Sequence, residues 1–456
     1  MSQSSGAAQS APTPPYAGSS PSAAVTTTAT AVFPPRAPGA PATGNQAAKP
    51  AAKAGRSAEV RSTPAWLSQW RLLVSAFCVV TAALTTVMLF STWQGARAAA
   101  ADTAQLVRVQ TVKVDLLRAD ALATNAFLVG GLEPAQPRAA YDSALAEVER
   151  TVTDAAEAQP ADRAALAALG EAILTYSSSM ELARANNRQG FPVGAAYLNQ
   201  ASTALRSTAL PLVDNLVTAN QQRSRDAMSP LPWIVVILPG LLGLAALVYV
   251  NQQLARRFRR RFNVGIVIAA VASLLMIVFA GLASGSQGAE DSRLLTGSYA
   301  TVVDGAIARS AANDAKANES LRLISRGSGA TFEKKWVAAA ATVTSKVSGD
   351  SLQSVAGAWR TYAAAHDAIV RLDTAGDWDK AVAAATSTAA GSSTADFTSF
   401  DNAVRTIVDR AGSHTTNDLD SGRVVFLGLL VLALVAGLAA AASAWRGITS
   451  RIEEYA

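Results

Sequence analysis

The sequence predicts an all-α membrane protein with four transmembrane helices and two tandem extracytoplasmic four-helix bundles. Three observations predict this fold class. Four apolar stretches without a charged residue are long enough to cross a bilayer, which needs about 20 residues per helix. Only 16% of the 456 residues are charged, against about 25% in soluble domains. Between the stretches, apolar side chains recur at steps of three and four, as in amphipathic helices.

Residues 1–65 are predicted to form a disordered cytoplasmic tail. They consist mainly of Ala, Pro, Ser, Thr and Gly, and they hold ten of the chain's 18 prolines. Such a composition buries too little apolar surface to offset the entropy cost of ordering. The pairs Pro14-Pro15 and Pro34-Pro35 suit a polyproline-reading partner, and a plain tether is the alternative role.

Four membrane spans follow, and tryptophans border them. The spans are expected at residues 72–90, 231–250, 264–283 and 424–445. Trp70 precedes the first span, Trp93 follows it, and Trp445 closes the fourth, as expected of side chains that anchor helices at the membrane interface. The lipid bilayer is therefore an expected partner.

Charge segregation predicts the orientation of these spans in the cell membrane. Residues 1–71, 251–263 and 446–456 together hold 13 basic and 3 acidic side chains, whereas the loops 94–230 and 284–423 each carry a net charge of −2. The positive-inside rule then places both termini and the arginine-rich turn in the cytoplasm, and both long loops outside.

The turn at 251–263 contains a cluster of arginines. These membrane-proximal basic residues are Arg256, Arg257, Arg259, Arg260 and Arg261. A nucleic-acid patch is one interpretation. At the cytoplasmic ends of two spans, the expected role is to fix topology and to contact anionic lipid head groups. No nucleic-acid partner is therefore expected.

Each long loop shows the pattern of a four-helix bundle. The loops have 137 and 140 residues in the same order of spans, which predicts an internal duplication. Apolar stripes such as that from Leu166 to Met180 indicate four helices in the first loop, and glycines and prolines such as Pro160 separate them. We expect the first and last bundle helices to continue into the membrane without a break.

The sequence contains no enzyme motif that we can identify. Cys78 is the single cysteine, and His366 and His414 are the only histidines, which leaves little for redox or metal chemistry. We therefore expect no enzyme, no cofactor and no metal site. His366 continues an inward-facing stripe and is expected to be a hydrogen-bonded bundle residue.

Two groups of residues are candidates for ligand or partner binding. Arg118 and Asn125 lie seven residues apart, hence on one face of the first bundle helix, where a guanidinium can hold a carboxylate. The second group repeats late in both loops and is a candidate partner surface: Asp214, Asn215, Asp401 and Asn402. For both groups, ordinary surface or interhelical ion pairs are the alternative.

The final span is followed by the sequence Trp-Arg-Gly-Ile-Thr-Ser-Arg-Ile-Glu-Glu-Tyr at residues 445–455. Together with the two predicted bundles and the Ala- and Arg-rich composition, this ending resembles the actinobacterial GlnX-type membrane proteins. The resemblance implies a partnership with an extracytoplasmic amino-acid-binding lipoprotein and with the cytosolic serine/threonine protein kinase G. Each loop is also similar to the four-helix ligand-binding module of bacterial chemoreceptors.

These observations lead to an expected role as a non-enzymatic transmembrane sensor or relay. Only 11 residues follow Trp445, so a signal is expected to pass to a separate cytoplasmic partner. The alternatives are a receptor that binds a small molecule directly and a structural or scaffolding protein of the envelope. The sequence leaves open whether the bundles pair within one chain or between two copies in a homodimer.

Overall fold

The computed structural model describes residues 63–453 apart from 131–132, 134, 190–192, 230–231 and 259–262. Most of the predicted tail at 1–65, and Arg259, Arg260 and Arg261 of the turn, lie outside the described residues. The described residues are almost entirely helical and include no strand, which confirms the predicted fold class.

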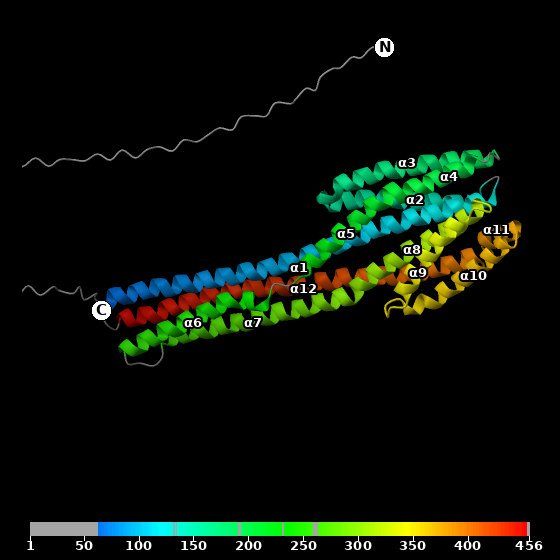
Figure 1. Cartoon of the computed structure of the whole chain (residues 1–456). Coiled ribbons are helices and arrows are strands. Elements are labelled where there is room, and N and C mark those ends of the chain that lie inside the picture. Colours follow the sequence, from blue (N-terminus) through cyan, green and yellow to red (C-terminus); the bar gives the residue numbers. More distant parts are fainter. Residues whose placement is uncertain are drawn as a thin grey trace, which may run out of the picture. The chain divides into compact units, whose positions relative to one another are not determined.

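Twelve α-helices make up most of the described chain (Figure 1). In chain order they are α1 (Thr63–Val129), α2 (Ala135–Ala158), α3 (Arg163–Arg188), α4 (Val193–Ala204), α5 (Leu210–Ala227), α6 (Trp233–Phe258), α7 (Val264–Thr296), α8 (Ser298–Ile324), α9 (Ala330–Val347), α10 (Ala356–Thr374), α11 (Trp378–Thr386) and α12 (Ser393–Glu453). Three short turns complete them: the 3-10 turns η1 (Pro160–Asp162) and η3 (Gln353–Val355), and the π-helical turn η2 (Leu205–Ala209), which links α4 to α5.

Among the described residues, four helices are long and apolar enough to cross a membrane, within Trp66–Val129, Trp233–Arg256, Val264–Ile324 and Leu427–Ser450. Their outer faces expose large apolar side chains, which suits contact with lipid. Gly437 lets α12 approach α1 closely, because a Cβ at this position would lie 2.1 Å from the Cβ of Ala82. These features suggest insertion into a membrane, and the orientation stays a prediction.

Two helices join the apolar part of the molecule to the bundles without a break. α1 has 67 residues and α12 has 61, so the two rods are about 100 Å and about 90 Å long at 1.5 Å per residue. They pack against each other and run side by side (Figure 1). The expected continuity is confirmed for the first helix of the first loop, α1, and α12 shows the same continuity at the end of the second loop.

The same expectation is wrong for the last helix of the first loop. α5 ends at Ala227, and α6 begins only at Trp233. Pro230 and Pro232 stand between them in the sequence, and proline has no backbone N–H to continue a helical ladder. In the second loop, a milder interruption at Gly297 separates α7 from α8.

Each loop folds into four antiparallel helical segments around its own apolar core. The first bundle consists of α1, α2, α3 and the α4–η2–α5 segment, with Leu116 and Tyr176 in its core. The second bundle consists of α8, α9, α10 and α12, and α11 is a short addition. Its core is aromatic, with Trp336, Trp359 and Phe400.

The two bundles pack on each other, a contact that the sequence did not predict. α1 packs against both α8 and α12. Leu321 of α8 belongs to the core of the first bundle, and Leu128 of α1 packs with Ile369 and Ala385 of the second. The two bundles therefore share an apolar interface.

Candidate functional site

Arg206 connects the two bundles. Its Nη1 donates a hydrogen bond to Asp120 Oδ2 on α1 at 2.7 Å, and its Nη2 donates to Asp314 Oδ1 on α8 at 2.6 Å. Asp120 is fully buried and also accepts from the hydroxyls of Ser202 and Tyr176, at 2.6 Å and 3.4 Å. One guanidinium thus links a carboxylate in the core of the first bundle to a carboxylate of the second. We call Asp120, Ser202, Arg206 and Asp314 the Arg206 node.

Arg206 itself lies on an irregular stretch of helix. Arg206 belongs to the π-helical turn Leu205–Ala209, and such turns frequently mark functional sites. Burial lowers the pKa of Arg206, but the charges of Asp120 and Asp314 and their hydrogen bonds outweigh burial and raise the pKa above its ordinary value. The guanidinium therefore stays charged.

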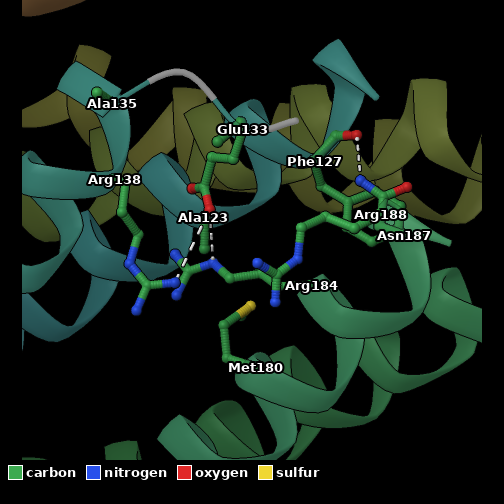
Figure 2. Close-up of a pocket in the computed structure, with 10 residues that line it drawn as sticks. Ala123, Phe127, Glu133, Ala135, Arg138, Met180, Arg184, Asn187 and Arg188 are labelled. Atoms are coloured by element: carbon green, nitrogen blue, oxygen red, sulfur yellow. Dashed lines mark hydrogen bonds and ion pairs between the residues drawn. The ribbon is translucent and has the colours of Figure 1, made fainter. Parts of the chain in front are cut away.

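A cavity of about 170 Å³ lies at the end of the first bundle where α1 turns into α2. We call it the Arg184 pocket, and its walls are Ala123, Ala126 and Phe127 from α1, Glu133 from the turn, Ala135 and Arg138 from α2, and Met180, Arg184, Asn187 and Arg188 from α3. Figure 2 shows the side chains of Arg138, Arg184 and Arg188 gathered in one place, with Glu133 above them and Met180 beneath.

Arg184 is held firmly in this pocket. Its side chain is only 8% exposed; Nε lies 3.1 Å from Glu133 Oε2, and Nη1 donates to Glu181 Oε1 at 2.9 Å. The guanidinium also stacks on the ring of Tyr141, with 3.9 Å between its carbon and the ring centroid. Three contacts thus fix the direction of a nearly buried cation.

Two polar atoms of the Arg184 pocket are buried without a hydrogen bond. They are Nη2 of Arg184 and Oε1 of Glu133. A buried donor or acceptor without a partner costs about 1–3 kcal/mol, so native proteins rarely leave such atoms unpaired unless a site needs them. Each of the two atoms has less than 1 Å² of exposed surface, so the pocket walls cover them and do not present them to the cavity.

The core of the second bundle contains a network of buried charges around Glu319. Its Oε1 accepts from Lys316 Nζ at 2.6 Å and from the Ser393 hydroxyl at 2.8 Å. Its Oε2 lies 2.9 Å from His366 Nδ1, and the ring of His366 stacks on Trp336 with 3.7 Å between centroids. Both carboxylate oxygens of Glu319 are therefore engaged.

Opposite charges set the pKa values in this network. Burial raises the pKa of Glu319, but the charge of Lys316 and the hydrogen bond to His366 outweigh burial and lower the pKa to about 2. Burial lowers the pKa of His366, but Glu319 and Glu333 outweigh it and leave the pKa above 6.5. His366 is fully buried and hydrogen-bonded, as the sequence predicted.

In the first predicted pair of binding residues, one side chain is half-buried and the other is engaged between the bundles, and their binding role stays a prediction. Arg118 is half-buried on α1, where its charge lowers the pKa of Asp115, although burial, the larger cause, raises that pKa to about 6. Asn125 donates its side-chain amide to the backbone oxygen of Ala385 at 3.0 Å and so fastens the first bundle to α11.

The repeated Asp-Asn pairs occupy equivalent positions in the two bundles. Asp214 forms an ion pair with Lys113 of α1 at 2.6 Å, and Asp401 forms one with Arg309 of α8 at 2.9 Å. Each aspartate thus ties the last helix of its bundle to the first, which is the interhelical alternative considered for them. The neighbouring side chains of Asn215 and Asn402 are exposed.

The arginine-rich turn is described only in part. Arg256 is exposed near the end of α6. The side chain of Arg257 lies outside the described part, as do Arg259 to Arg261. The proposed contact with lipid head groups therefore stays a prediction.

Sequence reasoning missed the residues that carry the polar sites of the first bundle. Arg184 lies four residues after Met180 and continues the apolar stripe of α3, and Asp120 lies four residues after Leu116 on α1. A charged residue on a buried stripe is the signal that could have singled out both, because such a position requires a partner inside the fold.

Comparison with known proteins assigns a class to this region. Residues 95–229 match the family model of an actinobacterial sensor domain. The matched range covers the whole first bundle, including the Arg184 pocket and the Asp120, Ser202 and Arg206 side chains. No curated protein and no solved structure matches the chain. The findings support a sensor-type actinobacterial protein with helices suited to a membrane.

Proposed function

We propose that this chain is a non-enzymatic transmembrane sensor that passes a signal from its extracytoplasmic bundles to a cytoplasmic partner. The continuity of α1 carries the proposal, because one helix bears both a membrane span and the buried Asp120 of the Arg206 node. A shift or rotation at the bundle end of such a rod moves its membrane end as well.

The partners form the second part of the proposal. A ligand-loaded amino-acid-binding lipoprotein docks on the outer bundles, and a serine/threonine kinase of the protein kinase G type receives the signal inside. The support is the likeness of the chain to GlnX-type proteins together with the sensor-domain match over residues 95–229. Because the Arg206 node contacts both bundles, a change that docking causes in one bundle passes to the other through these contacts.

A disulfide cross-linking experiment in the membrane tests the relay. Leu89 of α1 and Ala433 of α12 belong to one apolar cluster, so cysteines at these positions report on the packing of the two rods. Cys78 is replaced by serine to remove the native thiol. We expect the rate of disulfide formation in full-length protein in nanodiscs to change when a loaded binding lipoprotein is added.

A matched variant sharpens this test. Arg206→Gln removes the charge that joins the bundles and is expected to abolish the change in cross-linking rate. Recovery of neither a binding lipoprotein nor a kinase with the solubilised protein, combined with a constant cross-linking rate, would contradict the proposal.

A second candidate function is direct reception of a small molecule, as in chemoreceptor modules. The Arg184 pocket favours it, because the cavity walls gather three arginines, one of them buried, beside Glu133. Direct binding of a small molecule and docking of a binding protein are compatible functions. The Arg184 pocket and the Arg206 node lie in the same bundle but involve different residues.

A further inference from the structure

A cavity of about 180 Å³ lies between the two bundles, and we call it the interbundle pocket. One wall belongs to α4 and η2 of the first bundle, and the other wall belongs to α8 and α9 of the second. A molecule that binds in this cavity therefore contacts both bundles at once.

The first bundle lines the interbundle pocket with short polar side chains. Asn199, Thr203 and Ser207 follow one another at steps of four residues along α4 and η2, and all three line the cavity. Their side chains form no hydrogen bond with a described residue, and Thr203 and Ser207 are exposed. Two hydroxyls and one amide are thus free to donate hydrogen bonds to a ligand.

The second bundle contributes a cation and an apolar surface to the pocket. Phe332 of α9 packs against the core of the first bundle, and the ammonium nitrogen of Lys335 lies 5.3 Å from the centre of the Phe332 ring. This cation–π contact places the ammonium group beside a ring that lines the cavity. Lys335 is exposed and forms no ion pair with a described residue, so its charge is available to a ligand.

The charge on the pocket walls favours an anion with a single negative charge. Arg206 and Lys335 both line the cavity, and no acidic residue of the described chain does. Arg206 is already paired with Asp120 and Asp314, so Lys335 carries the one charge on the described walls that lacks a partner. A carboxylate carries one negative charge at neutral pH, whereas a phosphate carries about 1.5 to 2.

A larger cavity beside the interbundle pocket suits an anion less well. It has a volume of about 430 Å³ and shares Arg206 and Lys335 with the interbundle pocket, but Asp214 and Asp314 also line it. These two carboxylates repel an anion and offset the attraction of the cations. The anion site is therefore assigned to the smaller cavity.

The size of the interbundle pocket and the ring of Phe332 limit the rest of the ligand. A cavity of roughly 150 Å³ holds a molecule as large as benzene, with about six non-hydrogen atoms. The interbundle pocket has a similar volume. A carboxylate with a short hydrocarbon chain fits this space and packs its chain on the Phe332 ring.

We infer that the interbundle pocket binds a small monocarboxylate. The carboxylate pairs with Lys335 of the second bundle and accepts hydrogen bonds from Thr203 and Ser207 of the first, while the hydrocarbon chain contacts Phe332. The inference rests on direct reception of a small molecule, the second candidate function, and names a ligand class and a site for it. Binding links α9 to the helical segment that bears Arg206, and so strengthens the contact between the bundles.

Calorimetric titration of the full-length protein in detergent tests the inference. The probes are propionate and butyrate, with propionamide as a neutral molecule, propylammonium as a cation and inorganic phosphate as an anion of higher charge. We expect propionate or butyrate to bind at least tenfold more tightly than each of the other three probes. Absence of binding by both monocarboxylates, or a smaller preference, would overturn the inference.

Substitutions on the two walls locate the site. Lys335→Gln is expected to weaken binding of the preferred monocarboxylate about tenfold or more, because a charge-assisted hydrogen bond is lost. Thr203→Val replaces a hydroxyl with a methyl group and is expected to weaken binding about threefold. Both side chains are exposed, so both variants should retain the fold. Unchanged affinity in Lys335→Gln would place the ligand elsewhere and overturn the inference.

Lys334→Gln and Thr208→Val are the matched controls. Lys334 precedes Lys335 in the chain, Thr208 lies on the same π-helical turn as Arg206, and both are exposed residues outside the pocket walls. Each control should leave the affinity unchanged. Losses in the controls as large as those in the pocket variants would also overturn the inference.

The outcome is separable from that of the proposed functions. Monocarboxylate binding that Lys335→Gln weakens supports the inference even when cross-linking between α1 and α12 never changes, and in that case only the relay fails. A lipoprotein that alters cross-linking while no monocarboxylate binds supports the relay and overturns the inference. Binding of another small molecule that neither Lys335→Gln nor Thr203→Val affects supports direct reception and overturns this site.

Discussion

The two bundles share one plan but treat their buried charges differently. In the second bundle, Glu319 has both oxygens engaged, by Lys316 and Ser393 on one side and by His366 on the other. In the first bundle, Arg184 and Glu133 each keep an unpaired atom beside a cavity. The contrast is one of degree, because Nε2 of His366 is also buried without a hydrogen bond and lies 3.4 Å from Glu333 Oε2.

The equivalent aspartates show the same contrast. Asp401 and Arg309 have side chains that are 7% and 8% exposed, whereas Asp214 and Lys113 are 52% and 28% exposed. One duplicated ion pair is thus part of a core and the other part of a surface. The comparison teaches that the same kind of interhelical ion pair is buried in the second bundle and exposed to solvent in the first.

The largest expected loss of stability comes from removing the carboxylate at the centre of the buried charge network around Glu319. Glu319→Ala leaves the charges of Lys316 and His366 buried without compensation, which typically destabilises a protein by about 3–5 kcal/mol. The measurement is the free energy of unfolding of the full-length protein in detergent. Glu290→Ala, which removes an exposed ion pair with Arg293, is the control and should cost less than about 1 kcal/mol. Equal costs for the two variants would refute the description of the second bundle as a closed core.

The duplicated ion pairs give the next largest effect. Asp401→Ala removes the partner of the buried Arg309 and is expected to cost about 3 kcal/mol. Asp214→Ala removes an exposed pair and should cost about 0–1 kcal/mol. The same unfolding titration measures both variants, so each serves as the control of the other. A larger cost for Asp214→Ala would reverse the comparison.

A smaller effect tests the connection between the bundles. A double-mutant cycle of Arg206→Gln and Asp314→Asn is expected to give a coupling energy of about 1 kcal/mol, within the range for directly contacting residues. The same cycle with Arg206→Gln and the distant Asp409→Asn should give a coupling near zero. Additive costs in the first cycle would show that the node does not join the bundles energetically.

The smallest effect is a pH dependence of the second bundle. Because the pKa of His366 is raised above 6.5 in the folded chain, folding takes up a proton, and this stabilisation is complete below pH 6.5. It is lost as the pH rises through the raised pKa, so the free energy of unfolding should fall from pH 6.5 upward.

His366→Gln is expected to flatten this slope. Burial raises the pKa of Asp115 to about 6, so its contribution to stability is lost as the pH rises from 3.8 to about 6, and the His366→Gln variant keeps that part of the profile. A slope of the same size in the His366→Gln variant would assign the pH dependence to another group.

Much of this architecture follows from patterns that are local in the chain. The stripe from Leu166 to Met180 predicted a helix, and the structure contains α3 there with these residues in its core. The predicted continuity of the last helix of the first loop with the second span was wrong. The spacing of apolar and polar residues did not reveal the break, whereas Pro230 and Pro232 in the sequence between α5 and α6 indicate it. Local patterns also identified His366 as an inward bundle residue.

The binding residues were harder to predict for a physical reason. Arg118 and Asn125 were selected because they share a helix face, but a shared face does not reveal which groups meet it from other elements. Asn125 meets Ala385, 260 positions away in the chain. Arg184 and Glu133 are likewise far apart in the chain and meet only in the folded structure.

The sequence alone determined the all-helical class, the four segments that are long and apolar enough to cross a membrane, and the inward-facing stripes, since each depends on neighbouring residues. Only the tertiary structure decided that the two bundles pack into each other and that Arg206 joins them. It also decided which polar atoms remain unpaired. Burial and hydrogen bonding are set by groups that are distant in the chain, and helical periodicity carries no information about those pairings.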